Sequence, residues 1–531
     1  MLATSTAANK GVLTVGDLLD YLSPGLSGPD WPPDVFALVV ALLQKSGAYT
    51  RVVGEWPPSS HPPTWCATTV DIGKRWREAL IRELPAPTEI LEWWQVVIHH
   101  RALPVSGVGG VDELWRALLQ LCAVADEAAR GAGIPSVVEA DDDSFDQKAT
   151  KLLLTRNTLC VQVDPSRACV LPKLHTPQNG MTIRSLSHNL ALCSAGDVRA
   201  NWFRLAARRM NRSLNLLIVP WPWTIQPAQF KQAPGSIANL PKDFGFFDYV
   251  PDGARFPKDL LEALFRDAEA VVGEGQVDCV IFPESSLTPE SHEDLRKVVC
   301  ELHKAVLIAG ISDPAAHTNY LTMEVPTADG RVVRVGPQHK HHRWRLEKSQ
   351  ILQYGLGSSL DPAKSLWERI PLSARELYFV SARPWLTLCT LICEDLARQD
   401  PVADILRSVA PNLLITLLMD GPQLISRWSA RYATVFADDP GCSVLTLTSL
   451  GMASLSRPRG ASPSRSIALW KDAQSGGPVQ IEMPFDAKAM ILSLAIELRD
   501  EWTADGRGDY GSTGYPILAG VYPIRGGLAV T

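Results

Sequence analysis

The sequence predicts an α/β protein with strands buried on both faces, joined to a helical amino-terminal domain. From about residue 158 onward, short runs of apolar residues alternate with segments that carry helix-start signals. Most of these runs are apolar almost throughout, as expected for strands that helices or a second sheet cover on both faces. Residues 1–150 differ, because proline-rich pieces separate segments of helical periodicity. These two observations place the chain in the α/β class.

Length, composition and charge narrow the class of protein. The chain has 531 residues, of which 46% are apolar and 20% charged, and this suits a globular protein of two or three domains. The net charge of −6 argues against nucleic acid as the main partner. The longest strongly apolar helical stretch, 35–43, is far shorter than the roughly 20 residues that cross a bilayer, and we find no targeting segment. We therefore expect neither a membrane nor a nucleic-acid partner.

The cysteines indicate a compartment. Ten of them are scattered without CxxC pairs, and several lie inside apolar runs, among them Cys122, Cys160, Cys279 and Cys389. This pattern is typical of reduced, buried thiols rather than of a disulfide framework. It predicts a cytoplasmic protein.

Residues 1–150 form a mainly helical domain of unknown role in this interpretation. They hold seven of the sixteen tryptophans, and segments 35–45, 73–84, 88–101 and 112–131 have helical character. In the last segment Leu114, Leu118, Leu121 and Ala125 recur at helical spacing, which predicts one buried face. An acidic stretch at 137–147 is the expected linker to a second domain over 158–531.

The second domain contains the predicted strands. A hairpin is expected over 319–336, around an Asp-Gly turn, and a helix is expected to start at Ser291. The apolar runs predict strands at 159–164, 214–220, 277–283, 305–311, 386–392, 412–418, 442–449 and 489–498.

Two predicted strands end in reactive side chains. The run 277–283 leads into "IFPE" with Glu284, and the run 386–392 leads into "LICED" with Cys393. Catalytic groups commonly lie where strands of an α/β sheet end, because the loops there line a crevice. Between these two residues, "QHK" places Lys340 after the second strand of the predicted hairpin. A carboxylate, a cation and a thiol in this order indicate one site.

The ordered motifs "IFPE", "QHK" and "LICED" resemble those of the nitrilase, or carbon–nitrogen hydrolase, superfamily. The resemblance covers roughly 158–510, including the tail 498–507, which is similar to the end of the family's sheet. It implies a four-layer αββα sandwich over 158–531, in addition to the helical amino-terminal domain. The insert 220–236, "PWPWTIQPAQFKQAPGS", departs from the family pattern and leaves the substrate class open.

The resemblance also assigns roles. It implies that Cys393 is the nucleophile, Glu284 the general base and Lys340 the charge that stabilises a tetrahedral intermediate. This fits the chemistry of amide or nitrile cleavage, which needs a soft nucleophile, a proton carrier and a fixed positive charge. By the same resemblance, Glu347 positions substrate or water, and the backbone N–H of Glu394 completes the oxyanion site. No cofactor is implied.

The basic stretch 338–350 contains other candidates. His339 and His341 alternate and could share a face, but no further metal-ligand motif supports them, so we expect no metal site. Trp344 beside Arg343 could stack on a base, although an anion-binding or solvent-facing loop suits an acidic protein better. Of the two lysines, Lys340 at a strand end is expected to be essential, and Lys348 is not.

Three functions remain open. The first is an amidase-like carbon–nitrogen hydrolase that forms a thioester with a small-molecule amide or nitrile. The second is an acyltransferase on the same chemistry. The third is a non-catalytic interaction module, since divergent nitrilase-like domains also occur beside or fused to reverse transcriptases in bacterial defence systems. The resemblance also allows a homo-oligomer.

Overall fold

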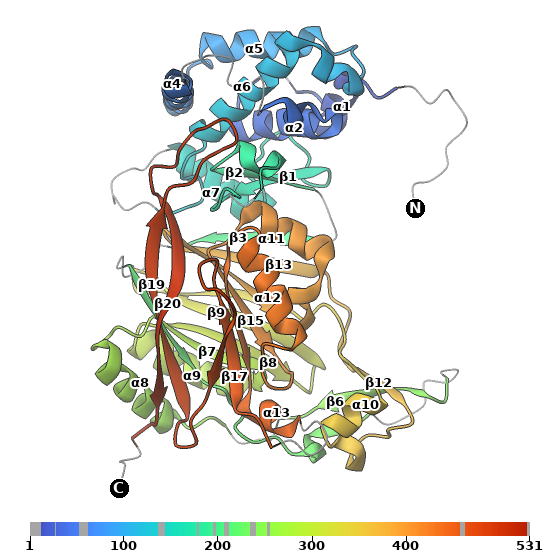
Figure 1. Ribbon diagram of the computed structural model, residues 1–531, viewed down its shortest axis with the longest axis vertical. Coiled ribbons are helices and arrows are strands. Elements are labelled where there is room, and N and C mark those ends of the chain that lie inside the picture. The colour runs from blue at the N-terminus through green and yellow to red at the C-terminus, as the bar shows by residue number, and fades with distance from the viewer. Residues whose placement is uncertain are drawn as a thin grey trace. The chain divides into compact units, whose positions relative to one another are not determined.

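The structure is a computed structural model, in which the chain forms two compact units (Figure 1). The amino-terminal unit contains Met1–Gly133, Val138–Gly196 and Asp500–Tyr510. The sandwich unit contains Ile134–Val137, Asp197–Arg499 and Gly511–Thr531. The expected domain boundary near residue 150 is therefore misplaced. The described residues are 12–26, 28–52, 62–135, 144–177, 180–194, 198–205, 212–233, 241–251, 255–456 and 462–527.

The amino-terminal unit is mainly helical, as predicted. Leu114, Leu118, Leu121 and Ala125 are fully buried on one long helix, which confirms the predicted face. A two-stranded antiparallel sheet and the segment 500–510 complete this unit. Its helices and strands are α1 (Val15–Leu22), α2 (Pro32–Ser46), η1 (Ala48–Arg51), α4 (Pro62–Ile81), α5 (Thr88–His99), η2 (Val105–Gly110), α6 (Asp112–Ala128), α7 (Ser144–Arg156), β1 (Ala168–Pro172), η3 (Ile183–Leu186) and β2 (Leu190–Ser194).

The predicted strand at 159–164 is wrong, and a buried carboxylate explains why. Asp34 at the start of α2 accepts hydrogen bonds from the backbone N–H groups of Val161, Gln162 and Val163. These donors need a partner when buried, and the carboxylate replaces the neighbouring strand that would otherwise supply one. The apolar run therefore stays buried without joining a sheet.

The segment 500–510 also differs from the prediction, which placed it at the end of the family's sheet. Arg507 is 1% exposed, and its guanidinium pairs with Asp505 at 3.0 Å, Asp126 at 3.1 Å and Glu127 at 2.8 Å. Asp126 and Glu127 belong to α6, so these ion pairs hold the segment within the amino-terminal unit. A buried cation requires such partners, because burial of an unpaired charge is costly.

The sandwich unit is built on two seven-stranded sheets. The first has the order β10-β9-β8-β7-β4-β19-β20, and the second has the order β18-β17-β16-β15-β14-β13-β3. Their strands are β3 (Val198–Arg204), β4 (Ser213–Ile218), β7 (Cys279–Leu287), β8 (Val306–Asp313), β9 (Thr318–Pro326), β10 (Val332–His339), β13 (Arg375–Arg383), β14 (Leu386–Ile392), β15 (Leu413–Leu418), β16 (Ser443–Thr448), β17 (Ser466–Lys471), β18 (Val479–Glu482), β19 (Ala489–Arg499) and β20 (Thr513–Ile524).

These sheets form the inner layers of the predicted αββα sandwich, which the structure confirms. Side chains from both sheets, such as Ile281 and Ile415, share one buried core between them. A second core lies between the first sheet and the helices α8 (Lys258–Val272) and α9 (Pro289–Arg296), which continues as η5 (Lys297–Leu302). The second sheet is covered by α12 (Trp428–Asp438) and α11 (Asp404–Val409), on the opposite side of the sandwich from α8 and α9 (Figure 1).

A third, smaller sheet adds a wall to the sandwich unit. Its order is β11-β12-β6-β5, and its core cluster includes Tyr249, Leu366 and Met419. The remaining elements are η4 (Pro227–Gln229), β5 (Phe230–Gln232), β6 (Phe244–Tyr249), β11 (Arg345–Leu346), α10 (Lys348–Gln353), η6 (Leu356–Ser358), β12 (Ser365–Glu368), η7 (Cys393–Ala397), η8 (Gln399–Ala403) and α13 (Leu450–Leu455).

Most predicted strands of the second domain are confirmed, and the expected hairpin is formed by β9 and β10. One helix start is wrong. The helix α9 begins at Pro289 rather than near Ser291, because the Thr288 hydroxyl caps it by accepting the Ser291 N–H.

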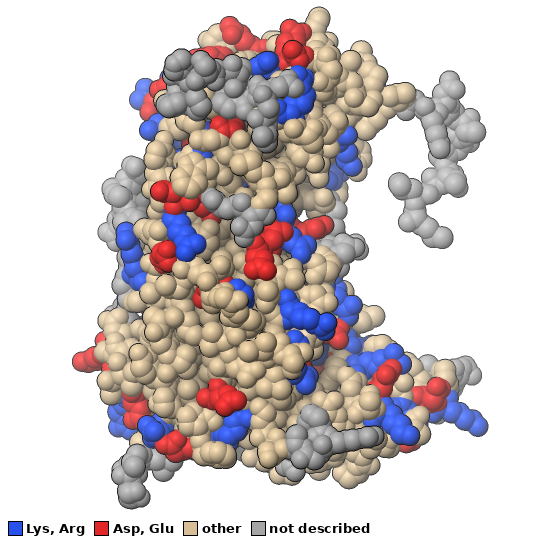
Figure 2. All heavy atoms as spheres, viewed as in Figure 1, with Lys and Arg blue, Asp and Glu red and all other residues tan. Residues whose placement is uncertain are grey.

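Two surface properties bear on possible partners. Within the described ranges, no helix combines the length and the hydrophobicity that a membrane crossing requires. On the face shown in Figure 2, Lys and Arg side chains are interspersed with Asp and Glu rather than gathered into one basic patch. That face therefore offers no concentrated positive charge for a phosphate backbone.

We expect Arg507→Ala to lower the free energy of unfolding of the amino-terminal unit by about 3–5 kcal/mol, because three buried carboxylates would lose their shared cation. Urea denaturation followed by tryptophan fluorescence measures this change. The matched control is Arg75→Ala, which removes exposed pairs with Asp71 and Glu89 and should cost less than about 1 kcal/mol. Equal losses in the two variants would contradict a structural role for the buried cluster.

Candidate active site

Two reactive side chains lie where parallel strands of the sandwich unit end. Glu284 is part of β7, which pairs in parallel with β4 and β8, and Cys393 directly follows β14, which pairs in parallel with β15. Cys393 has a φ of 50° and starts the turn η7, while Ser285, next to Glu284, has a φ of 53°. Left-handed backbone at a residue other than glycine is strained and tends to occur at functional sites. Both residues with left-handed backbone are thus a predicted catalytic residue or its direct neighbour.

Lys340 is the centre of a buried ion cluster. Its ammonium group lies 2.8 Å from Glu284 Oε1 and 2.7 Å from Glu368 Oε2, and the lysine and Glu284 side chains are each 1% exposed. Ammonium and carboxylate groups can be buried together only when each is paired and hydrogen-bonded. The cluster fixes the lysine charge in one place, as a group that stabilises an oxyanion requires.

Asn319 and Met419 complete the hydrogen bonds of this cluster. The Asn319 side-chain amide donates to Glu284 Oε1 at 2.8 Å and to Glu368 Oε1 at 2.9 Å. The backbone carbonyl oxygen of Asn319 accepts the backbone N–H of Lys340 at 2.9 Å. The Met419 N–H donates to the other Glu284 oxygen at 2.7 Å. Because Met419 follows β15 in the second sheet, Glu284 connects the two sheets of the sandwich.

The electrostatics of the cluster set the charge states. Burial acts to lower the pKa of Lys340, but Glu284 and Glu368 outweigh it and raise that pKa well above its usual value. Burial raises the pKa of Glu284, while Lys340 opposes this rise. A carboxylate with a raised pKa is a better proton acceptor than an ordinary one.

The Cys393 thiol belongs to the same electrostatic environment. Cys393 is 7% exposed, and burial together with the Glu284 charge raises its pKa, while Lys340 acts in the opposite direction. The thiol is therefore protonated at neutral pH and needs a base to become a nucleophile. Glu284 and Lys340 are thus in direct contact, and the charges of both act on the Cys393 thiol.

Glu347 does not lie in this site, and this prediction is corrected. Its exposed side chain pairs with Arg345 at 2.6 Å, and its backbone starts the short helix α10. Glu368 at the end of β12 occupies the position next to Lys340 instead, and it also accepts the Trp344 N–H at 3.1 Å. No motif in the sequence marks Glu368, because its approach to Lys340 depends on pairing within the third sheet.

The other predicted positions lie as follows. Lys348 is exposed as the first residue of α10, in contrast to the buried Lys340. The Glu394 side chain pairs with Arg398 and lies 3.2 Å from His342 Nε2, while its backbone follows Cys393 in η7. The role expected for the Glu394 N–H stays a prediction.

The remaining basic stretch is used for packing. The Trp344 ring contacts the rings of Phe230 and Phe247 in the third sheet and the ring of Tyr354, which follows α10. His341 contacts the Ser373 carbonyl oxygen at 2.7 Å. Across the described part of the chain, no group of three or more His, Cys, Asp or Glu side chains is arranged to hold a metal ion.

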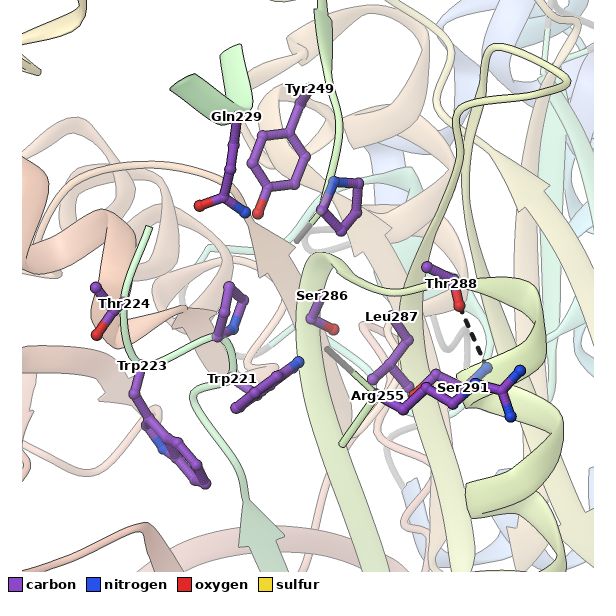
Figure 3. Close-up of a pocket in the computed structure, with 12 residues that line it drawn as sticks. Trp221, Trp223, Thr224, Gln229, Tyr249, Arg255, Ser286, Leu287, Thr288 and Ser291 are labelled. Carbon is purple, nitrogen blue, oxygen red and sulfur yellow. Dashed lines mark hydrogen bonds between the residues drawn. The ribbon is translucent and has the colours of Figure 1, made fainter. Parts of the chain in front are cut away.

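A cavity of about 250 Å³ lies beside the end of β7 (Figure 3). Trp221 and Trp223 of the insert 220–236 line one part of it, next to Ser286, while Gln229 and Tyr249 line another. The insert is anchored near the end of β16, where Gly451 N–H donates to the Pro222 carbonyl oxygen. The insert 220–236, which departs from the family pattern, therefore lines a pocket together with Ser286. Ser286 is two residues after Glu284 in the sequence.

No family model and none of the curated proteins matches the chain. Among solved structures, the chain is similar to a nitrilase-superfamily member of branch 10, Nit3 of Saccharomyces cerevisiae, with 12% identity and a TM-score of 0.29, covering 52% of this chain and 89% of that one. A CN-hydrolase superfamily protein of Xanthomonas campestris with an arsenic adduct in its active site shows 15% identity and a TM-score of 0.29, with coverages of 53% and 90%.

A third similar structure is the glutamine-dependent NAD+ synthetase of Acinetobacter baumannii in complex with ADP. It shows 12% identity and a TM-score of 0.30, and the match covers 53% of this chain and 45% of that one. TM-scores below 0.5 do not establish a shared fold, so the architecture described above rests on the strand order and the packing of this chain.

The buried Asp395 provides a pH-dependent test of the site. Burial raises the pKa of this carboxyl to about 6, above its unfolded value, so the folded state favours the protonated form. The contribution of the protonated Asp395 carboxyl to the free energy of unfolding is therefore complete below about pH 4 and is lost as the pH rises through about 6. We expect Asp395→Asn to raise the unfolding free energy at pH 8 by about 1–3 kcal/mol relative to the parent protein and to change it little at pH 4.

Urea denaturation of both proteins at the two pH values measures this difference. The exposed residue Asp404, at the start of α11, offers the control Asp404→Asn, which should change the unfolding free energy by less than about 1 kcal/mol at either pH. An Asp395→Asn effect of the same size at pH 4 and pH 8 would show that the burial of charge is not its cause.

Proposed function

We propose that the protein is a cysteine-dependent carbon–nitrogen hydrolase that cleaves a small-molecule amide through a thioester on Cys393. The observation that carries this proposal is the buried Glu284–Lys340 pair, whose charges both act on the thiol of Cys393 at a strained strand end. A proton acceptor, a fixed cation and a soft nucleophile are the three groups that acyl transfer from nitrogen requires.

The first half of the reaction forms the thioester. Glu284 accepts the proton of the Cys393 thiol as the sulfur attacks the carbonyl carbon, and the carbonyl oxygen becomes an oxyanion. Lys340 and the N–H of Glu394 stabilise that oxyanion. The intermediate collapses, the carbon–nitrogen bond breaks, and the leaving amine takes the proton from Glu284.

The second half releases the acid. Glu284, again a carboxylate, accepts a proton from water as the water oxygen attacks the thioester. A second tetrahedral intermediate forms at the same oxyanion position and expels the Cys393 sulfur, which recovers its proton from Glu284. Glu368 pairs with Lys340, and the Asn319 amide donates to both Glu284 and Glu368, so these two residues keep Lys340 charged and in place throughout.

The cavity beside β7 offers room for the part of the substrate remote from the scissile bond. Its lining combines the aromatic rings of Trp221 and Tyr249 with the hydroxyl of Ser286. Such a mixture suits a small molecule with a flat apolar part and a few hydrogen-bonding groups. We propose that the insert 220–236 selects the substrate in this way.

The cytoplasm is the compartment that we propose for this activity. All ten cysteines are free thiols, which accords with a reducing environment.

We expect Cys393→Ala to abolish both turnover and covalent adducts, because no other atom of the site can form the thioester. Intact-mass measurement after incubation with a pool of amides detects the adduct, and ammonia release measures turnover. The control is Cys389→Ala, a fully buried position four residues earlier, in β14, which should keep most of the activity. Equal loss in the two variants would mean that the nucleophile is misassigned, and release that required an added acceptor would indicate acyl transfer instead of hydrolysis.

We expect Glu368→Gln to lower kcat by at least about tenfold with a smaller change in KM, because the Lys340 charge would lose one of its two fixed carboxylates. Steady-state kinetics on an amide found in the adduct screen provide the measurement. Glu347→Gln is the matched control, since its exposed side chain lies outside the site, and it should change kcat less than about twofold. A stronger effect of Glu347→Gln than of Glu368→Gln would refute the assignment made from the structure.

A further inference from the structure

Two cysteines face each other across the small hairpin of the amino-terminal unit. Cys169 of β1 stands directly opposite Cys193 of β2 in the antiparallel register. The sandwich unit contains the whole of the proposed active site, so this pair has no part in the catalytic proposal. Its geometry and environment point to separate chemistry.

The register sets the distance between the two backbones. Within β1, the Val170 N–H donates to the Thr158 hydroxyl, and the Val170 carbonyl accepts the Leu159 N–H, so this residue turns its backbone groups away from β2. Hydrogen-bonded and non-bonded pairs alternate along antiparallel strands, and Cys169 and Cys193 therefore form a hydrogen-bonded pair with Cα atoms about 5.5 Å apart. Disulfides bridge Cα separations of about 4.4–6.8 Å.

The Cys193 thiol acts on the Cys169 thiol, and the two residues differ in exposure. A hydrogen bond from the Cys193 thiol lowers the pKa of the Cys169 thiol, against the effect of burial. Burial instead raises the pKa of the Cys389 and Cys442 thiols. Cys169 keeps part of its surface exposed, while Cys193 is 3% exposed. The more exposed of the two cysteines thus has the lowered pKa, and a second cysteine stands opposite it, as in pairs with an attacking and a resolving cysteine.

We propose that Cys169 and Cys193 are a redox-modification site, at which a hydroperoxide converts the two thiols into an intramolecular disulfide. The Cys169 thiolate attacks the peroxide oxygen, the O–O bond breaks, and a sulfenic acid forms on Cys169. The Cys193 sulfur then attacks the Cys169 sulfur, and the oxygen leaves as water. Two thiols and one hydrogen peroxide thus give one disulfide and two waters.

The same register makes this bond reversible. Opposed Cβ atoms in an antiparallel pair lie about 4.5–5.5 Å apart, with hydrogen-bonded pairs at the longer end, whereas a disulfide needs about 3.5–4.5 Å. The strands must therefore draw together when the bond forms. Strained disulfides are more easily reduced, so thiol reductants of the cytoplasm can reopen this one.

Peptide mapping provides a direct test with the full-length protein. Hydrogen peroxide is added in slight excess, free thiols are alkylated, and the protein is cut with trypsin without reduction. Cleavage after arginine and lysine places Cys169 in the peptide 168–173 and Cys193 in the peptide 185–199, and neither peptide contains another cysteine. We expect these two peptides to be linked and lighter by two hydrogen atoms, and dithiothreitol to separate them.

Single variants separate the two steps. Cys193→Ser should stop at the sulfenic acid, which dimedone traps on Cys169, and Cys169→Ser should give neither product. The Cys393→Ala variant should form the linked peptides as the parent does, because the site is independent of the proposed catalysis. Oxidation of Cys169 in the parent protein without the linked peptides, or loss of the free Cys393 thiol before that of Cys169, would overturn the proposal.

Discussion

The proposed site depends on one constraint, which is the neutralisation of a lysine that has almost no contact with solvent. Lys340 comes from the end of β10, Glu284 from β7 and Glu368 from β12, so the ammonium group joins the first large sheet to the small third sheet. The Met419 N–H extends the same network to the second large sheet. Removing Lys340 would leave two buried carboxylates without their shared cation, and this ties the integrity of the sandwich to the electrostatics of its site.

The sequence predicts the residues of the site that follow strands, and it misses the one that depends on lateral pairing. Glu284 and Cys393 each come at the end of an apolar run, and Lys340 follows the second strand of the hairpin predicted from the Asp-Gly turn, so all three positions are marked by patterns visible in one dimension. Glu368 reaches Lys340 because β12 lies parallel to β6, a pairing between segments about 120 residues apart. Local sequence patterns carry no information on such pairing. They therefore point to Glu347, which is nearer to Lys340 in the sequence, whereas the structure places Glu368 against Lys340.

The same distinction explains which parts of the fold were predictable. The runs that became β14 and β15 are buried on every residue, so their length and composition suffice to define them. The run 159–164 has a similar composition, yet Asp34 supplies its hydrogen bonds from a distant helix. The segment 500–510 leaves the sheet because its arginine has partners in α6, which no spacing rule in the sequence connects to it.

The cluster around Arg507 has a consequence for the order in which the protein can be completed on the ribosome. Glu127 emerges early in synthesis, but the arginine that neutralises it follows 380 residues later. At translation rates of 5–20 residues per second, this interval lasts roughly 20 to 80 s. During that time the amino-terminal unit lacks the cation that neutralises its buried acidic side chains, so its final closure waits until Arg507 has been made. The segment 500–510 thus acts as a latch that ties the maturation of the first unit to the synthesis of the second.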